Sequence, residues 1–226
     1  MKRIIYVFAG GPIRDLEFVR QCMASNPPVD VICADGGARH AMSLGMVPRM
    51  IVGDMDSIRP AVEHHFHQMG VPFLKSPRRK NETDTELALE QALLLAPDKI
   101  WIWGGLGLRL DHTLANLSLL LRGRHYRTDI RLVDEWCEVF LVKHGAVIEG
   151  NPGQTISFYP MAGTVSGITL KGFEYPLHDG TMTLENPYGI SNRLMEHRAL
   201  VSIAEGFLLA ILYHKAQTFP EGDEAS

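Results

Sequence analysis

The sequence of 226 residues has few cysteines, no long apolar segment and no excess of positive charge. Its three cysteines, Cys22, Cys33 and Cys137, have no CxxC spacing, which favours reduced thiols in the cytoplasm over a disulfide framework. The late apolar run at 207–213 is far shorter than the roughly 20 residues that span a bilayer. The net charge of −4 gives no electrostatic reason to expect a nucleic acid or an anionic membrane as partner. We therefore expect a soluble cytoplasmic protein.

The chain does have two long stretches with different periodicity. Up to about residue 134, β-rich runs alternate with helical patterns. The predicted strands are 3–9, 29–34, 49–53, 71–74, 99–103 and 129–133, and the predicted helices lie near 14–24, 38–44, 60–69, 84–96 and 112–122. Such alternation predicts an α/β domain with a doubly wound parallel sheet.

The second stretch begins at about Trp136 and contains short strand-like runs separated by Gly, Pro and Asn, without a convincing helix. Short strands of this kind are typical of an antiparallel sandwich or barrel. The predicted fold is therefore an N-terminal doubly wound parallel-sheet domain, residues 1–138, followed by a C-terminal antiparallel β-sandwich, residues 139–226.

Polar residues and glycines follow several predicted strands at the point where each strand ends. In an open parallel sheet, ligands bind at the carboxyl ends of the strands. The residues at this edge are Asp35, Gly36 and Gly37 after the second strand, Asp54 and Asp56 after the third, Asp84 after the fourth, and Gly104, Gly105, Arg109, Asp111 and Asn116 after the fifth. We expect carboxylates to gather there beside glycines that let the backbone approach a ligand.

Asp54 and Asp56 are separated by one residue in the segment IVGDMDSI. In an extended segment, residues i and i+2 point the same way, and two close carboxylates repel unless a proton or a cation lies between them. Oxygen-only ligands shared with phosphate are typical of magnesium sites. The alternative is that Asp56 only caps a turn before the helix at Pro60. Together with Asp35, Asp84 and Asp111, however, the pair favours metal binding.

Other polar residues have structural interpretations. Thr83 and Glu86 match a helix capping box, and Asp84 lies in the same first turn, where the helix dipole favours any carboxylate. Three further groups are interpreted as a solvated loop, a surface cluster and strand packing, respectively: Lys75, Arg78, Arg79 and Lys80; His64, His65 and His67; Trp101 and Trp103. Arg109, after the GGLG segment, is a fixed cation suited to phosphate oxygens.

The segments ADGGA, GDMDSI, NETDTELAL, GGLGLRLDHTLAN, LKGFEYPL and GISN, in this order, resemble bacterial thiamine pyrophosphokinases. The resemblance extends from about residue 4 to residue 210. It implies an α/β catalytic, nucleotide-binding domain followed by a β-sandwich that binds thiamine and forms a homodimer. It also implies Mg²⁺-dependent transfer of pyrophosphate from ATP to thiamine, giving thiamine diphosphate and AMP.

The resemblance also implies roles for individual residues. The implied catalytic residues are Asp54, Asp56, Asp84, Arg109 and Asp111, of which Asp54, Asp56 and Asp84 would bind the metal. The implied nucleotide-binding residues are Asp35, Gly36, Gly37, Gly104, Gly105, Arg109, His112 and Asn116, and the implied thiamine-binding residues are Tyr175, Ser191 and Asn192.

Two positions depart from the family pattern. Asn81 stands where an aspartate is expected, and Leu108 stands where a glycine is expected. Two other functions also fit the acidic edge: a magnesium-dependent phosphohydrolase, which would use water in place of thiamine, and a nucleotide sensor without catalysis. The three differ in whether AMP and thiamine diphosphate appear together.

Overall fold

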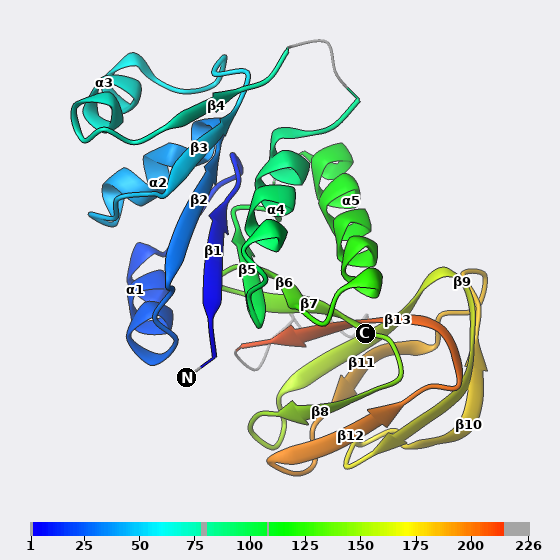
Figure 1. Cartoon of the computed structure of the whole chain (residues 1–226). Coiled ribbons are helices and arrows are strands. Elements are labelled where there is room, and N and C mark those ends of the chain that lie inside the picture. The colour runs from blue at the N-terminus through cyan, green and yellow to red at the C-terminus, as the bar shows by residue number, and fades with distance from the viewer. Residues whose placement is uncertain (1, 78–80, 108, 215–226) are drawn as a thin grey trace, which may run out of the picture. The chain divides into compact units, whose positions relative to one another are not determined.

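A computed structural model describes residues 2–77, 81–107 and 109–214 (Figure 1). The chain divides into two compact units, Met1–Glu135 and Trp136–Ser226. The boundary predicted between residues 138 and 139 falls inside β7 (Cys137–Val142), the first strand of the second unit. Among the described residues, the helices lack the length and apolar character that a bilayer span requires.

The first unit contains a parallel sheet with the strand order β4-β3-β2-β1-β5-β6. Its strands are β1 (Ile4–Phe8), β2 (Asp30–Ala34), β3 (Met50–Gly53), β4 (Phe73–Lys75), β5 (Lys99–Trp103) and β6 (Asp129–Val133). The prediction of a parallel α/β sheet is confirmed. The chain leaves β1 in one direction as far as β4 and then returns to place β5 on the other side of β1. Ligands bind at such a reversal of strand order, outside the carboxyl ends of the strands.

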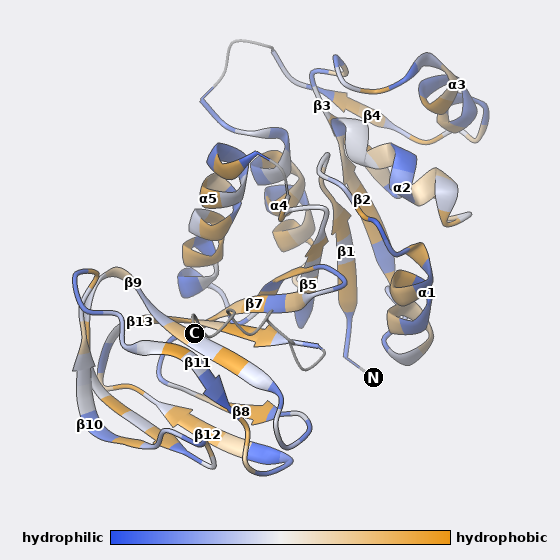
Figure 2. Cartoon of the chain, turned by 180° about the vertical axis from the view of Figure 1, so that it is seen from behind, coloured by the Kyte–Doolittle hydropathy of each residue, from blue (hydrophilic) through white to orange (hydrophobic). Residues whose placement is uncertain are grey.

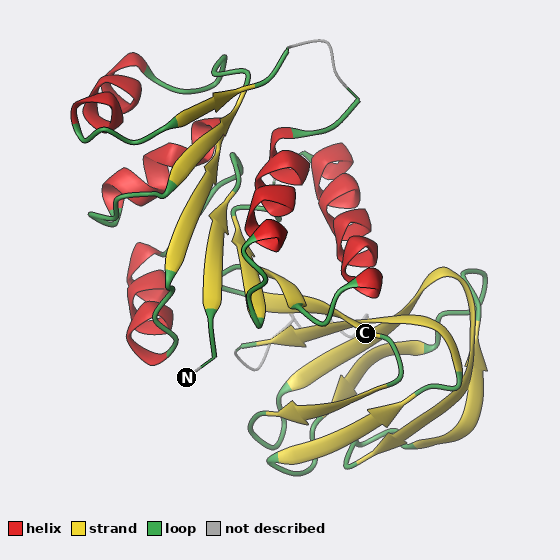
Figure 3. Cartoon of the chain, in the orientation of Figure 1, coloured by secondary structure: helices red, strands yellow, loops and turns green. Residues whose placement is uncertain are grey.

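Helices cover both faces of this sheet (Figure 3). One face carries α1 (Leu16–Ser25), α2 (Ala38–Ser43) and α3 (Pro60–Gln68), and the other carries α4 (Asp84–Leu94) and α5 (Leu110–Leu119). The Thr83 half of the predicted capping box is confirmed, because the Thr83 hydroxyl accepts a hydrogen bond from the Glu86 amide at 3.1 Å, whereas the Glu86 carboxylate contacts Arg122. This cap fixes where Asp84 enters the helix.

The central strand β1 is apolar along its whole length because both faces of the sheet are covered there. Figure 2 colours β1 as mostly hydrophobic, and each of its residues is buried. On the face of α1 to α3, the Tyr6 ring stacks on Trp101 with ring centroids 5.5 Å apart, and Trp103 packs beside them. Trp101 and Trp103 therefore have the packing role that the sequence favoured.

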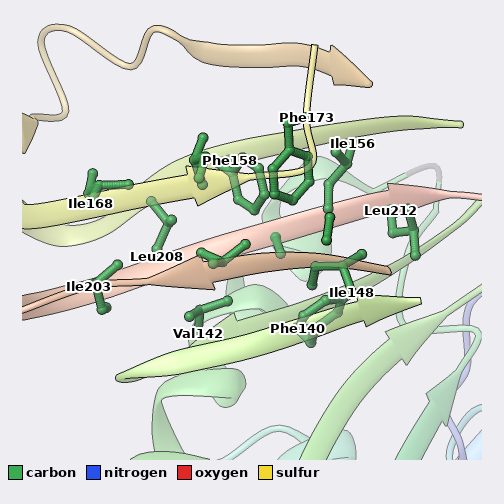
Figure 4. Close-up of a cluster of buried hydrophobic side chains, with 14 of the residues drawn as sticks. Phe140, Val142, Ile148, Ile156, Phe158, Ile168, Phe173, Ile203, Leu208 and Leu212 are labelled. Carbon is green, nitrogen blue, oxygen red and sulfur yellow. The ribbon is translucent and has the colours of Figure 1, made fainter. Parts of the chain in front are cut away.

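The second unit consists, in its described residues, of strands and their connections. They are β7, β8 (Gly145–Glu149), β9 (Thr155–Lys171), β10 (Leu177–Met182), β11 (Gly189–Arg193), β12 (Arg198–Ser202) and β13 (Glu205–Tyr213). The first part of β9 pairs with β11 and β13, and its last part pairs with β10 and β12, all antiparallel. The predicted antiparallel β-sandwich is confirmed, and Figure 4 shows its core, which includes Phe140, Phe158 and Phe173.

The sequence pattern favours two strand-like runs, 154–160 and 163–172, where the structure has the single strand β9. Ala162, which lies between the two runs, and Gly163, which begins the second, have φ angles of 64° and 119°. These residues bend the strand without ending it, so that β9 belongs to both layers of the sandwich. Strand β11 was not predicted, because GISNR lacks the apolar alternation that marks a strand.

Candidate active site

A cavity of about 340 Å³ lies at the carboxyl ends of β1, β2 and β5, where the strand order reverses. Its lining includes the predicted site residues Asp35, Gly36, Asp84, Gly104, Gly105, Arg109, His112 and Asn116. These residues come from segments far apart in the sequence. These cavity-lining residues therefore lie together at the carboxyl edge of the sheet, as the rule for strand ends predicted.

Glycine is required where the loops around the cavity approach one another. A Cβ on Gly11 would lie 2.2 Å from the Gly104 carbonyl oxygen, and a Cβ on Gly37 would lie 2.0 Å from the Phe8 carbonyl oxygen. Gly37 does not line the cavity, so its contribution is the packing of the turn after β2 against β1. The Gly11 amide also donates a hydrogen bond to Gly104 at 3.0 Å, which joins the loops after β1 and β5.

Asp35, Asp54 and Asp84 form an acidic triad beside the cavity. One carboxylate oxygen of each lies within 4.8 Å of the others. Gly53 lies between them: its Cβ would be 2.9 Å from the Asp35 Cβ and 3.1 Å from the Asp84 Cγ. Because Gly53 has no side chain and a φ of 150°, the carboxylates of two separate loops can meet there.

Asp35 is the buried member of the triad, with 3% of its surface exposed. Its Oδ2 accepts a hydrogen bond from the Ser57 amide at 3.1 Å, whereas its Oδ1 is buried and has no hydrogen-bond partner among the described residues. Burial raises the pKa of the Asp35 carboxyl, and the negative charges of Asp84 and Asp54 raise it further. A buried carboxylate with an unpartnered oxygen is an energetically costly arrangement unless a proton or a cation joins it.

Asp56 lies outside this triad. The segment is not extended, because Met55 has a left-handed φ of 67°, so the expectation that Asp54 and Asp56 point the same way is wrong. Instead, the Asp56 amide donates to Asp54 Oδ1 at 3.0 Å, and the exposed Asp56 carboxylate accepts from the Ser57 hydroxyl. Asp56 lies in the segment between β3 and α3, whose N-cap is Arg59.

The triad suits a magnesium ion in its donor chemistry. Its donors are carboxylate oxygens alone, which Mg²⁺ prefers over nitrogen or sulfur. The unpartnered Asp35 Oδ1 supplies a buried oxygen for which the described residues offer no donor. A cation would also relieve the repulsion that raises the pKa of Asp35. The residues present therefore fit the predicted metal.

Arg109 and Asp111 form an exposed ion pair at the wall of the cavity. The guanidinium contacts the carboxylate through two hydrogen bonds of 2.6 and 3.2 Å. The hydrogen bonds from Arg109 hold the pKa of Asp111 at about 2. Asp111 therefore stays charged and orients Arg109, while the buried Asn116 donates to the Gly105 carbonyl oxygen at 2.7 Å and braces the same loop.

In the second unit, Tyr175 and Asn192 line a small hollow of about 100 Å³. Tyr175 is exposed, but Asn192 is buried. The Asn192 amide accepts from the Tyr175 backbone NH at 3.0 Å and donates to the Tyr175 carbonyl oxygen at 2.8 Å. The side chain of Asn192 thus holds the Tyr175 backbone. The neighbouring Ser191 is exposed, with a left-handed φ of 58°.

Sequence reasoning missed several residues of the cavity. Gly10 and Gly11 follow β1 and line the cavity, and the rule for strand ends that located Asp35 would also have located them. Ser57 and Arg39 line it too, but no local pattern distinguishes them. Three residues of the basic run, Arg78, Arg79 and Lys80, lie outside the described residues. Of the two positions that differ from the family pattern, Leu108 also lies outside the described residues, and Asn81 is exposed.

The fold and this site define a class of protein: a two-unit chain whose α/β unit has a glycine-lined cavity at the reversal point of its parallel sheet, where such folds bind ligands. The family model described as thiamin pyrophosphokinase, catalytic domain, matches residues 26–133. The model described as thiamin pyrophosphokinase, vitamin B1 binding domain, matches residues 145–208. The two matches fall in the α/β unit and in the β-sandwich unit, respectively.

Individual relatives agree with these family models. The chain is 34% identical to a thiamine pyrophosphokinase of Bacillus subtilis over 182 residues, which are 80% of this chain and 85% of that protein. The crystal structure of thiamine pyrophosphokinase from Bacillus subtilis has a TM-score of 0.83, with 30% identity, 94% of this chain covered and 100% of that chain. The crystal structure from Geobacillus thermodenitrificans has a TM-score of 0.82, with 26% identity, 96% of this chain covered and 100% of that chain.

The chain therefore belongs to the thiamine pyrophosphokinase family. The resemblance stated from the sequence motifs is confirmed. The prediction of an enzyme that uses ATP to pyrophosphorylate thiamine is confirmed at the level of the family.

Proposed function

We propose that the protein transfers the β,γ-pyrophosphoryl group of ATP to the hydroxyl oxygen of thiamine, giving thiamine diphosphate and AMP in a Mg²⁺-dependent reaction. The observation that carries the proposal is the acidic triad beside the glycine-lined cavity of a chain that belongs to this family. Pyrophosphoryl transfer depends mainly on positioning and on neutralising charge, and both are features of this cavity.

Asp35, Asp54 and Asp84 are the proposed metal ligands, and Asp56, two residues from Asp54, stays a predicted contributor. When bound, Mg²⁺ supplies positive charge that neutralises the triphosphate and polarises the phosphorus under attack. The glycines at 10, 11, 104, 105 and 107 let the backbone approach the nucleotide, because they line the cavity without side chains. Arg109, held by Asp111, is placed to contact phosphate oxygens.

The thiamine hydroxyl must lose a proton as its oxygen attacks the β-phosphorus and the bond to the AMP oxygen breaks. Asp111 is a poor acceptor for that proton, because its pKa is held at about 2, far below the neutral range in which a general base works best. We therefore assign Asp111 to orienting Arg109.

Thiamine carries a positive charge on its thiazolium ring, and the exposed Tyr175 ring offers an aromatic face for such a cation. Asn192 supports this contact indirectly, since its amide holds both backbone groups of Tyr175. The proposal also includes a homodimer with a thiamine site shared between its subunits, as the resemblance implies.

Size-exclusion chromatography with light scattering tests the dimer, and a fully active monomer would contradict it.

The function is tested by incubating the purified protein with ATP, Mg²⁺ and thiamine and separating the products by chromatography. AMP and thiamine diphosphate should appear in equal amounts, and neither should appear when EDTA is present. ADP or inorganic phosphate formed regardless of thiamine would identify a phosphohydrolase. ATP binding without any product would identify a nucleotide sensor.

A further inference from the structure

Arg39, on α2, contacts two separate loops of the cavity through one side chain. Its Nη1 donates to the Gly36 carbonyl oxygen at 2.7 Å, in the turn after β2. Its Nη2 donates to the carbonyl oxygens of Gly10 and Gly11 at 2.6 and 2.9 Å, in the loop after β1. Gly10, Gly11 and Gly36 all line the cavity.

The next residue, His40, adds a contact to the same loop. Its Nε2 lies 2.8 Å from the Gly11 carbonyl oxygen and must be the donor, because that oxygen can only accept. Burial lowers the pKa of His40 to about 4, so the ring makes this hydrogen bond in its neutral form. Two consecutive residues of α2 therefore fasten the loop after β1, but only Arg39 joins that loop to the turn after β2.

We propose that Arg39 is a positioning residue for nucleotide binding, whose guanidinium clamps the loop at Gly10–Gly11 to the turn at Gly36 and so fixes two walls of the cavity. The proposal deepens the function proposed above and rests on ATP binding in this cavity. Asp35 directly precedes Gly36, so the same clamp holds the turn that carries the buried member of the acidic triad.

Arginine suits this role in a way that lysine does not. A guanidinium presents several NH donors in a rigid planar fork, which can reach carbonyl oxygens of two loops at once. A lysine ammonium keeps the charge but is a single point at the end of a flexible chain. A clamp thus predicts that lysine fails at position 39, whereas a purely electrostatic role predicts that lysine succeeds.

Arg59 provides a matched control for charge. Arg39 and Arg59 line the same neighbouring hollow of about 280 Å³, and the charge of Arg59 contributes to lowering the pKa of Arg39. Hydrogen bonds from Arg59 to the loop carbonyls at 10, 11 and 36 do not occur in the described structure, where Arg39 fills that role. Arg59→Gln therefore removes a nearby positive charge and leaves the clamp in place.

The experiment compares Arg39→Gln, Arg39→Lys and Arg59→Gln with the unaltered protein. We expect both Arg39 variants to raise the KM for ATP by about tenfold or more, the size of effect expected when charge-assisted hydrogen bonds are lost. The KM for thiamine should change by less than about twofold, because the clamp lies on the nucleotide loops. Arg59→Gln should leave both values within about twofold. A KM for ATP restored by Arg39→Lys, or equal losses in Arg39→Gln and Arg59→Gln, would overturn the proposal.

A binding measurement keeps the test independent of turnover and of folding. Titration calorimetry with Mg²⁺ and α,β-methylene-ATP should show the same tenfold loss of affinity in Arg39→Lys, which retains the charge and most of the side-chain volume. Guanidinium ion at millimolar concentration should partly restore the affinity of Arg39→Ala, and no restoration would count against the clamp. If the unaltered protein binds the nucleotide but makes no thiamine diphosphate, the proposed function fails while the role of Arg39 in binding is still measured.

Discussion

Asp35 and Asp111 occupy equivalent positions in the chain and opposite environments in the structure. Each lies in the first turn of the helical segment after a parallel strand, Asp35 after β2 and Asp111 after β5. Burial and neighbouring carboxylates raise the pKa of Asp35, whereas two hydrogen bonds from Arg109 lower the pKa of the exposed Asp111 to about 2. The position at the end of a strand brings a carboxylate to the edge of the sheet, but its neighbours decide what it can bind.

The largest expected effect comes from removing one charge of the acidic triad. Asp84→Asn should lower kcat by roughly two orders of magnitude or more, because the proposed metal site would lose a ligand that acts in the transition state. Steady-state kinetics at saturating ATP and Mg²⁺ measure this effect. Asp98→Asn is the control, since Asp98 binds the Arg3 backbone amide at the other end of the sheet. Near-normal turnover in Asp84→Asn would contradict the assignment of the triad to the metal.

The second-largest effect should come from a change that moves the carboxylates of the acidic triad without removing their charges. Gly53→Ala keeps every carboxylate but places a Cβ 2.9 Å from the Asp35 Cβ and 3.1 Å from the Asp84 Cγ. We expect the Mg²⁺ concentration for half-maximal activity to rise by about tenfold, since small displacements in a metal site weaken binding strongly.

Gly45→Ala is the matched control for Gly53→Ala. Gly45 also has a positive φ, 69°, but nothing lies within 4 Å of its Cβ position. Both variants therefore place alanine at a positive φ, which strains an L residue, whereas only Gly53→Ala also brings a collision with the triad. If the two variants require the same Mg²⁺ concentration, the geometry of the triad is not what determines metal affinity.

The sequence predicted the parallel sheet and most of the cavity because both follow from local patterns. Apolar runs define the strands, and the carboxyl end of each strand locates Asp35, Asp54 and Asp84. The exclusion of Asp56 from the triad could not be predicted, because it depends on the left-handed φ of Met55. A non-glycine residue seldom adopts that conformation, and the extended geometry was the better expectation from the sequence.

The role of Arg39 was beyond sequence reasoning for another reason. Arg39 contacts Gly36, three positions away in the sequence, and also Gly10 and Gly11, which are 29 and 28 positions away. No short sequence motif contains all of these residues. Asn192 is similar: the sequence associated it with thiamine, but its amide contacts the Tyr175 backbone, 17 residues away. Residues that hold loops are recognised by long-range hydrogen bonds, which only the folded chain displays.

A smaller effect should distinguish Asp35 from Asp111: the change in the free energy of unfolding of the metal-free protein when the residue is replaced. Asp35→Asn should raise the free energy of unfolding by on the order of 1 kcal/mol in EDTA at neutral pH, because it removes a buried charge that its neighbours repel. The raised pKa means that the folded state binds protons more readily, so the metal-free protein should gain stability from this group as the pH falls through its raised pKa. Asp35→Asn should lack this gain, as urea unfolding at several pH values will show. A loss of stability in EDTA would contradict the repulsion inferred here.

The smallest effect is expected from Asp111→Asn, which breaks an ion pair that is exposed on both sides. The unfolding midpoint at neutral pH should not change measurably, since exposed pairs contribute little, but the KM for ATP should rise about two- to fivefold because Arg109 loses its orientation. The pKa of Asp111 is lowered, so the contribution of the pair is present above the usual carboxyl pKa and is lost as the pH falls toward about 2. The KM effect should also shrink at high salt, which screens the exposed charges of Arg109 and Asp111. The opposite outcome is that Asp111→Asn lowers kcat as much as Asp84→Asn does, with no dependence on salt. That result would mean that Asp111 acts in the chemistry, and that Asp35 and Asp111 are more alike than their surroundings suggest.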